Sequence, residues 1–206
     1  VTEAGFGFDL GGEKFLDIKC QSAGLKPKAV VLTTTIRAIK YHGGADLKEL
    51  TTPNVDALTN GFPNLLKHIE NVQKFNISPV IAINKFTSDS DEEIEAILKF
   101  AASINVKVAV ADVWAHGGKG ALELAQCVID IVDEGKSSFK PLYSWDSSVE
   151  EKIDKIATEI YGANHVEYTA LAKSHLKRIK NLGLTHLPIC VAKTQKSLSD
   201  NAKLLG

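Results

Sequence analysis

The sequence contains no methionine, only three cysteines and no long apolar run. A membrane-spanning helix needs roughly 18 or more consecutive apolar residues, and neither such a run nor a signal peptide is visible. Cys20, Cys127 and Cys190 lie far apart and show neither CxxC nor Cys/His ligand spacing, which argues against a disulfide framework and a zinc site. These absences predict a soluble cytoplasmic protein whose thiols are reduced.

The sequence also lacks an excess of positive or negative charge. The 24 Lys and Arg residues nearly balance the 25 Asp and Glu residues, the formal net charge is -1, and no like-charge block occurs. Because phosphate binding requires a concentrated basic surface, this balance argues against nucleic acid as the main partner. The chain starts with Val1 and opens on a glycine-rich stretch that no strand precedes. We therefore expect a piece of a longer polypeptide.

Apolar runs alternate with amphipathic stretches from Ala29 onward, which is the pattern of repeated strand–helix–strand units. This pattern predicts an α/β fold with a doubly wound, mostly parallel sheet. The expected strands are residues 29–35, 79–84, 106–113 and 187–192, and the expected helices are residues 54–75, 91–104, 121–132, 149–161 and 170–182. Capping boxes are expected at Ser90 with Glu93 and at Ser147 with Glu150, and helix ends at Gly135 and Gly162.

The most informative stretch is residues 33–44, TTTIRAIKYHGG, which follows the apolar run 29–32. It predicts a strand covered on both faces that leads directly into a site, because open parallel sheets bind ligands at the carboxyl ends of their strands. Arg37 and His42 would then contribute a cation and an imidazole. The alternative is a threonine-rich strand end with an ordinary turn and one structural arginine, and residue types alone favour neither.

Two neighbouring strand patterns each end in a large aromatic residue, Phe86 and Trp114. In a doubly wound sheet both would emerge at the same carboxyl edge, where they could stack on a flat heteroaromatic ring. The simpler alternative is that both side chains only cover the rim of the sheet.

Glycine-rich stretches occur at residues 5–12 and 117–120, but neither matches a nucleotide fingerprint. No GxxxxGK[ST] run is present, the spacing after Gly5 is GxGxxxG, and the NKFT run at residues 84–87 lacks the aspartate of an NKxD element. The first stretch is therefore either a loop that wraps a purine edge or a flexible turn. No Ser/His/Asp or Cys/His arrangement indicates a nucleophilic centre, and of the histidines only His42 and His116 lie in glycine-rich loops.

Taken together, these segments resemble the formate–tetrahydrofolate ligase family. The resemblance covers essentially the whole chain and rests on four motifs, at residues 2–7 (TEAGFG), 35–44 (TIRAIKYHGG), 160–163 (IYGA) and 192–200 (AKTQKSLSD). Phe8, Gly12 and the pair Thr33 and Thr34 depart from what the family leads us to expect.

The resemblance implies ATP-dependent joining of formate to tetrahydrofolate through formyl phosphate, with Mg²⁺ and a monovalent cation, K⁺ or NH₄⁺, as cofactors. It implies a P-loop NTPase-like core whose P-loop portion would precede Val1, and a homo-oligomer in the full-length enzyme. Phe86 and Trp114 match the aromatic pair that sandwiches the folate, Val110 matches an apolar wall of that pocket, and Phe6, Gly7 and Gly11 match an adenine contact. Arg37, His42, Gly43 and Gly44 match a signature segment without an assigned role.

On this basis residues 1–135 are expected to form the folate- and nucleotide-binding portion and residues 136–206 a small peripheral subdomain. No catalytic residue is expected in the chain, which by itself should be inactive. Two other functions stay open: a non-catalytic α/β module that binds a nucleotide or another ligand, and a structural piece in which both aromatic residues are buried.

Overall fold

The computed structural model describes residues 1–192, 198–201 and 203–206, so residues 193–197 of the last family-like motif lie outside it. The chain divides into two compact units, Val1–Lys26 with Lys140–Asp200, and Pro27–Phe139 with Asn201–Gly206. Each unit is described by itself below. The expected ranges 1–135 and 136–206 differ from these units mainly because the first 26 residues group with the later segment.

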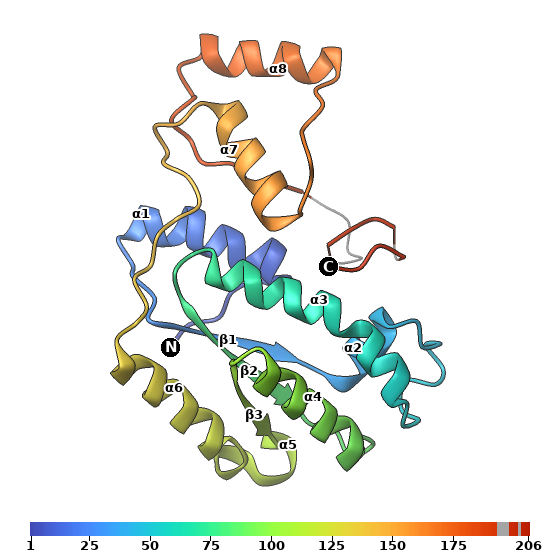
Figure 1. Cartoon of the computed structure of the whole chain (residues 1–206). Helices are drawn as coiled ribbons and strands as arrows, with labels where there is room; N and C mark the ends of the chain where they lie inside the picture. Colours follow the sequence, from blue (N-terminus) through green and yellow to red (C-terminus); the bar gives the residue numbers. More distant parts are fainter. Residues whose placement is uncertain (193–197, 202) are drawn as a thin grey trace. The chain divides into compact units, whose positions relative to one another are not determined.

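The second unit is built on a parallel sheet of three strands in the order β1-β2-β3 (Figure 1). The strands are β1 (Ala29–Thr34), β2 (Ser78–Asn84) and β3 (Lys107–Ala111). The register pairs Thr34 with Ile83 and Asn84 with Ala111, so all three strands end at one edge. Three of the four expected strands are therefore confirmed.

Helices cover both faces of this sheet, which confirms the α/β fold. On one face α3 (Val55–Gln73) and α4 (Asp91–Ser103) pack on the strands, and α2 (Ile36–His42) packs against α3. Helix α6 (Leu122–Glu134) contacts all three strands (Figure 1). The core of the unit joins α2, α3 and α4 to β2, and its fully buried side chains include Leu58, Ile69, Ile81, Ile83 and Ile97.

Helix starts and stops follow local capping chemistry. Ser90 and Glu93 form the expected capping box at the start of α4, and Gly135 ends α6 with a φ of 65°. The second capping box was predicted one residue too early, since Ser148 and Glu151, not Ser147 and Glu150, begin α7 (Val149–Lys155). Helix α7 continues as the π-helical turn η4 (Ile156–Ile160), and α8 (Ala170–Asn181) follows.

The predicted strand at residues 187–192 is wrong, because its backbone groups have other partners. The carbonyl of Leu187 accepts a hydrogen bond from Lys152 Nζ at 3.0 Å, and the amide of Ile189 donates to Tyr143 Oη at 3.1 Å. Pro188 has no amide hydrogen to offer a sheet. The segment is held by side chains, and alternation of apolar residues could not reveal that.

Two further expectations fail. Strand β1 is not covered on both faces, since Val31 is 41 % exposed and Thr33 is exposed too, as the edge position of β1 allows. The stretch after Gly5 is not a loop from Gly7 onward, because η1 (Gly7–Gly12), η2 (Phe15–Cys20) and α1 (Gln21–Ala23) form one helical run.

The glycines of that run serve packing. A Cβ at Gly11 would lie 2.0 Å from the carbonyl oxygen of Gly5, and a Cβ at Gly12 would lie 2.5 Å from the ring of Phe8. The two unusual residues Phe8 and Gly12 therefore fit each other, because the large ring occupies the space that the glycine leaves free.

Candidate functional site

The ends of the three strands bring Arg37, Phe86 and Trp114 to one edge of the sheet. Arg37 follows β1, Phe86 follows β2 and Trp114 follows β3, and the strand order places Phe86 in the middle. Phe86 is 37 % exposed and Trp114 is 85 % exposed. The sequence therefore correctly located both aromatic residues beyond the carboxyl ends of adjacent strands, and neither is sealed in the core.

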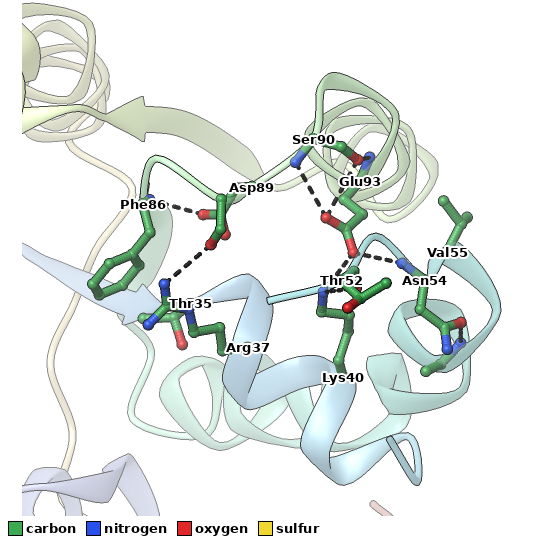
Figure 2. A network of polar contacts seen from close by, with 12 residues as sticks. Thr35, Arg37, Lys40, Thr52, Asn54, Val55, Phe86, Asp89, Ser90 and Glu93 are labelled. Atoms are coloured by element: carbon green, nitrogen blue, oxygen red, sulfur yellow. Dashed lines mark hydrogen bonds and ion pairs between the residues drawn. The ribbon is translucent and has the colours of Figure 1, made fainter. Parts of the chain in front are cut away.

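A tight turn fixes the backbone of Phe86. Its amide donates to Asp89 Oδ2 at 2.8 Å, and its carbonyl oxygen accepts from the amide of Asp89 at 3.1 Å. Ser90 then begins α4, so the turn lies between a buried strand and a capped helix. The Arg37 guanidinium lies over the ring, 4.3 Å from the ring centroid, and Figure 2 shows both side chains beside the turn.

Trp114 lies in the short helix α5 (Val113–His116), which the 3₁₀ turn η3 (Gly117–Ala121) follows. The amide of Asp112 donates to the carbonyl oxygen of Gly120 at 3.0 Å and closes this loop. Glycine is required at position 120, because a Cβ there would lie 2.1 Å from Asp112 O. The glycine-rich run therefore shapes the loop that presents Trp114.

The loops that carry the two aromatic residues are tied together. The amide of Lys85 donates to the carbonyl oxygen of Ala111 at 3.1 Å, and Lys85 Nζ lies 3.5 Å from Asp112 Oδ2. Val110, the expected apolar wall, pairs with Ile83 and packs half-buried against the core. His116 is exposed, with Nε2 3.9 Å from Asp112 Oδ2.

The segment after β1, which the sequence left unassigned, is helix α2 and a turn. Thr35 Oγ1 caps the helix by accepting from the amide of Ala38 at 3.0 Å. Gly43 has an ordinary φ of -79°, but a Cβ there would lie 1.7 Å from Ala57 O in α3. Gly44 has open space around it and a φ of 95°, a conformation that favours glycine. The two glycines are therefore needed for different reasons. Burial also lowers the pKa of His42, the residue before Gly43.

A buried ion pair anchors α2 to α4, and the sequence analysis missed it. Lys40 Nζ lies 2.7 Å from Glu93 Oε1, with side-chain exposures of 1 % and 0 % (Figure 2). Lys40 also donates to Thr52 O at 2.8 Å, and Glu93 accepts from the amides of Asn54 and Ser90 at 2.9 and 3.2 Å. Burial raises the pKa of Glu93, but the hydrogen bonds from Lys40 and the two amides outweigh it, so the pKa is lowered overall.

The family model for formate–tetrahydrofolate ligase matches residues 1–206. The chain belongs to this family. A formate–tetrahydrofolate ligase joins formate to a folate and consumes ATP, and this chain carries the family's sequence over all of its 206 residues.

The residues expected to contact adenine lie in the other unit. Phe6 precedes the first helical run and is 92 % exposed, and Gly7 begins that run with a φ of 75°. Gly11 lies under the backbone of Gly5, as described above. Among the described residues, no group of three His, Cys, Asp or Glu side chains could hold a metal ion, and no helix is long and apolar enough to cross a membrane.

A buried carboxyl pair lies on the helical run of this first unit, and it was also missed. Glu13 and Asp17 are 1 % and 0 % exposed, and Asp17 Oδ1 accepts from the amide of Leu142 at 2.8 Å. Burial, followed by the charge of Asp17, raises the pKa of Glu13 to about 8, and burial raises the pKa of Asp17 to about 7. The pair therefore retains a proton at neutral pH.

This pair predicts a pH-dependent stability. The folded protein holds a proton on Glu13 up to about pH 8, whereas the unfolded chain releases it near the ordinary value of 4.5. Since the folded state binds more protons in this window, the free energy of unfolding should fall as the pH rises through it. Glu13→Gln should flatten the profile measured by urea unfolding between about pH 5 and about pH 9, and the exposed-residue control Glu92→Gln should not. An unchanged slope in Glu13→Gln would contradict the assignment.

Both missed pairs left weak signals in the sequence. Lys40 follows Ile36 and Ile39 at the spacing of a buried helical face, and Glu93 occupies the third position of a predicted capping box. Glu13 and Asp17 are four residues apart, which places them on one helical face only if the stretch is helical. Because the glycines of residues 5–12 favour a loop or a turn, the sequence does not show that this condition is met.

Proposed function

We propose that this chain takes part in the ATP-dependent ligation of formate to tetrahydrofolate, and that Phe86 and Trp114 bind the pterin ring between them. One observation carries the proposal. Two large aromatic side chains are exposed beyond the ends of adjacent strands, on loops that a backbone hydrogen bond and the Lys85–Asp112 ion pair hold together. Exposure of a Trp indole is costly in water, and stacking on a flat ring would offset that cost.

The chain's part in the reaction is orientation. The family's activity requires the N10 amine of the folate to attack an activated formate, and a stacked pterin holds that amine in place while the rings exclude water. Val110, which packs on the core, would form an apolar wall of the pocket. ATP and Mg²⁺ would activate formate in this reaction. We propose that Phe6, Gly7 and Gly11 contact the adenine of ATP. We assign no residue of the chain to the metal ion.

Phe86→Ala and Trp114→Ala should each weaken the binding of a reduced folate by about ten-fold or more, since stacking on an aromatic side chain contributes roughly 1–3 kcal/mol per base. Calorimetric titration of the 206-residue chain measures the effect. Ile129→Ala is the control, because it removes a 51 % exposed apolar side chain from α6, away from the strand ends.

Fluorescence tests direct contact. Trp145→Phe leaves Trp114 as the reporter, and a reduced folate should quench it, whereas quenching should vanish in Phe86→Ala. A response to ATP but not to folate would instead support a nucleotide-binding module. Unchanged folate affinity in both alanine variants would reject the proposed pocket.

A further inference from the structure

We propose that Arg37 is a positioning residue for the folate ring, which acts by holding Phe86 in the orientation that stacks on the substrate. This inference rests on the proposed function. Arg37 belongs to the family-like segment whose role the sequence left open. Arg37 follows β1 and Trp114 follows β3, and β2, which leads to Phe86, lies between these two strands.

The contact has the geometry of a cation–π pair. The guanidinium carbon lies 4.3 Å from the centroid of the Phe86 ring, well within the distance at which such pairs attract. One face of the ring is thus covered by Arg37, while the residue Phe86 as a whole remains 37 % exposed. We place the pterin ring on the face of Phe86 opposite to Arg37, because the guanidinium already covers the other face.

Arg37 is restrained at two places, at its guanidinium and at its backbone. Arg37 Nη2 donates to Ser88 Oγ at 3.0 Å, and Ser88 belongs to the same turn that orients Phe86. The backbone of Arg37 lies in the first turn of α2, which Thr35 caps and the buried Lys40–Glu93 pair anchors (Figure 2). Arg37 therefore connects a rigid helix to the turn and to the ring.

The consequence concerns substrate affinity. A half-exposed ring without support loses conformational freedom when a ligand stacks on it, and that loss weakens binding. Support from Arg37 fixes the ring beforehand. Arginine also suits this role better than lysine. Its planar guanidinium can stack on the ring and donate a hydrogen bond to Ser88 at the same time, whereas a lysine ammonium would supply only a positive charge.

The experiment is a double-mutant cycle on folate affinity, measured by calorimetry with the 206-residue chain. Arg37→Met should weaken binding of a reduced folate about five-fold and Arg37→Lys about two-fold. Ser88→Ala, which keeps the arginine but removes its hydrogen bond, should also cause a loss of about two-fold. Arg178→Met is the matched control, because it removes an exposed arginine from α8 and should leave the affinity unchanged.

The decisive comparison uses Phe86→Leu. If Arg37 acts through the ring, Arg37→Met should cause no further loss in the Phe86→Leu background, and in the wild-type background it should shift the nuclear magnetic resonance signals of the Phe86 ring. An equal loss in both backgrounds would overturn the inference, since a purely structural role or a direct contact with the substrate predicts it. Full affinity in Arg37→Met, with reduced affinity in Phe86→Ala, would overturn this inference alone. Full affinity in both Phe86→Ala and Trp114→Ala would overturn the proposed function and this inference with it.

Discussion

Lys40→Met is expected to lower the free energy of unfolding by about 3–5 kcal/mol, the cost of leaving a buried charge without its partner. The Glu93 carboxylate would stay fully buried, with its pair at 2.7 Å removed and only amide and hydroxyl donors left. Thr52 would also lose the donor to its carbonyl oxygen. Urea unfolding followed by circular dichroism measures the change.

Lys99→Met is the matched control for this prediction. Lys99 forms an ion pair with Glu95 on the same helix, at 2.8 Å, but the two side chains are 74 % and 62 % exposed. Exposed pairs of this kind contribute about 0.3–0.5 kcal/mol. Similar losses of unfolding free energy in the two variants would show that burial does not make the Lys40–Glu93 pair more stabilising than an exposed pair.

Gly61→Ala is expected to lower the free energy of unfolding by about 3 kcal/mol, at the upper end for overpacking. Gly61 lies inside α3, where alanine would otherwise favour the helix by about 1 kcal/mol. However, a Cβ at this position would lie 2.0 Å from the carbonyl oxygen of Ile39 in α2. Because that obstacle is backbone, the two helices would have to separate.

The same measurement on two other glycines makes this prediction specific. Gly43→Ala should be comparably destabilising, because its Cβ would meet Ala57 O from the other side of the same helix pair. A Cβ at Gly118 would have no heavy atom within 4 Å, so Gly118→Ala should change the free energy of unfolding by less than about 0.5 kcal/mol. A small effect of Gly61→Ala would mean that α2 and α3 can move apart without loss. Since α2 also carries Arg37, the two damaging variants should weaken folate binding as well.

Periodicity along the chain predicts most of the elements of the second unit. Strands β1, β2 and β3 and helices α3 and α4 follow from alternating apolar and amphipathic runs, whereas α2 was not predicted. The capping box of Ser90 and Glu93 marks the start of α4. The place of Phe86 and Trp114 follows from the same rule, since parallel strands end at one edge. These features depend on residues that are near one another in the chain.

Features that depend on distant partners were missed or misassigned. The segment 187–192 looks like a strand until Lys152 and Tyr143 are seen to bind its backbone. The stretch after Gly5 looks like a loop because glycine disfavours helices, yet its glycines are needed for close contacts within a helical run.

The sequence by itself determined the family, the three parallel strands and the two aromatic residues at their ends, because motifs and periodicity are local properties of the chain. Only the tertiary structure revealed that Arg37 covers Phe86, that Lys40 pairs with Glu93 and that Glu13 and Asp17 retain a proton. The physical reason is that charge–ring contacts, buried ion pairs and desolvation each require side chains from different turns or elements to meet away from water. No spacing along the chain specifies such a meeting.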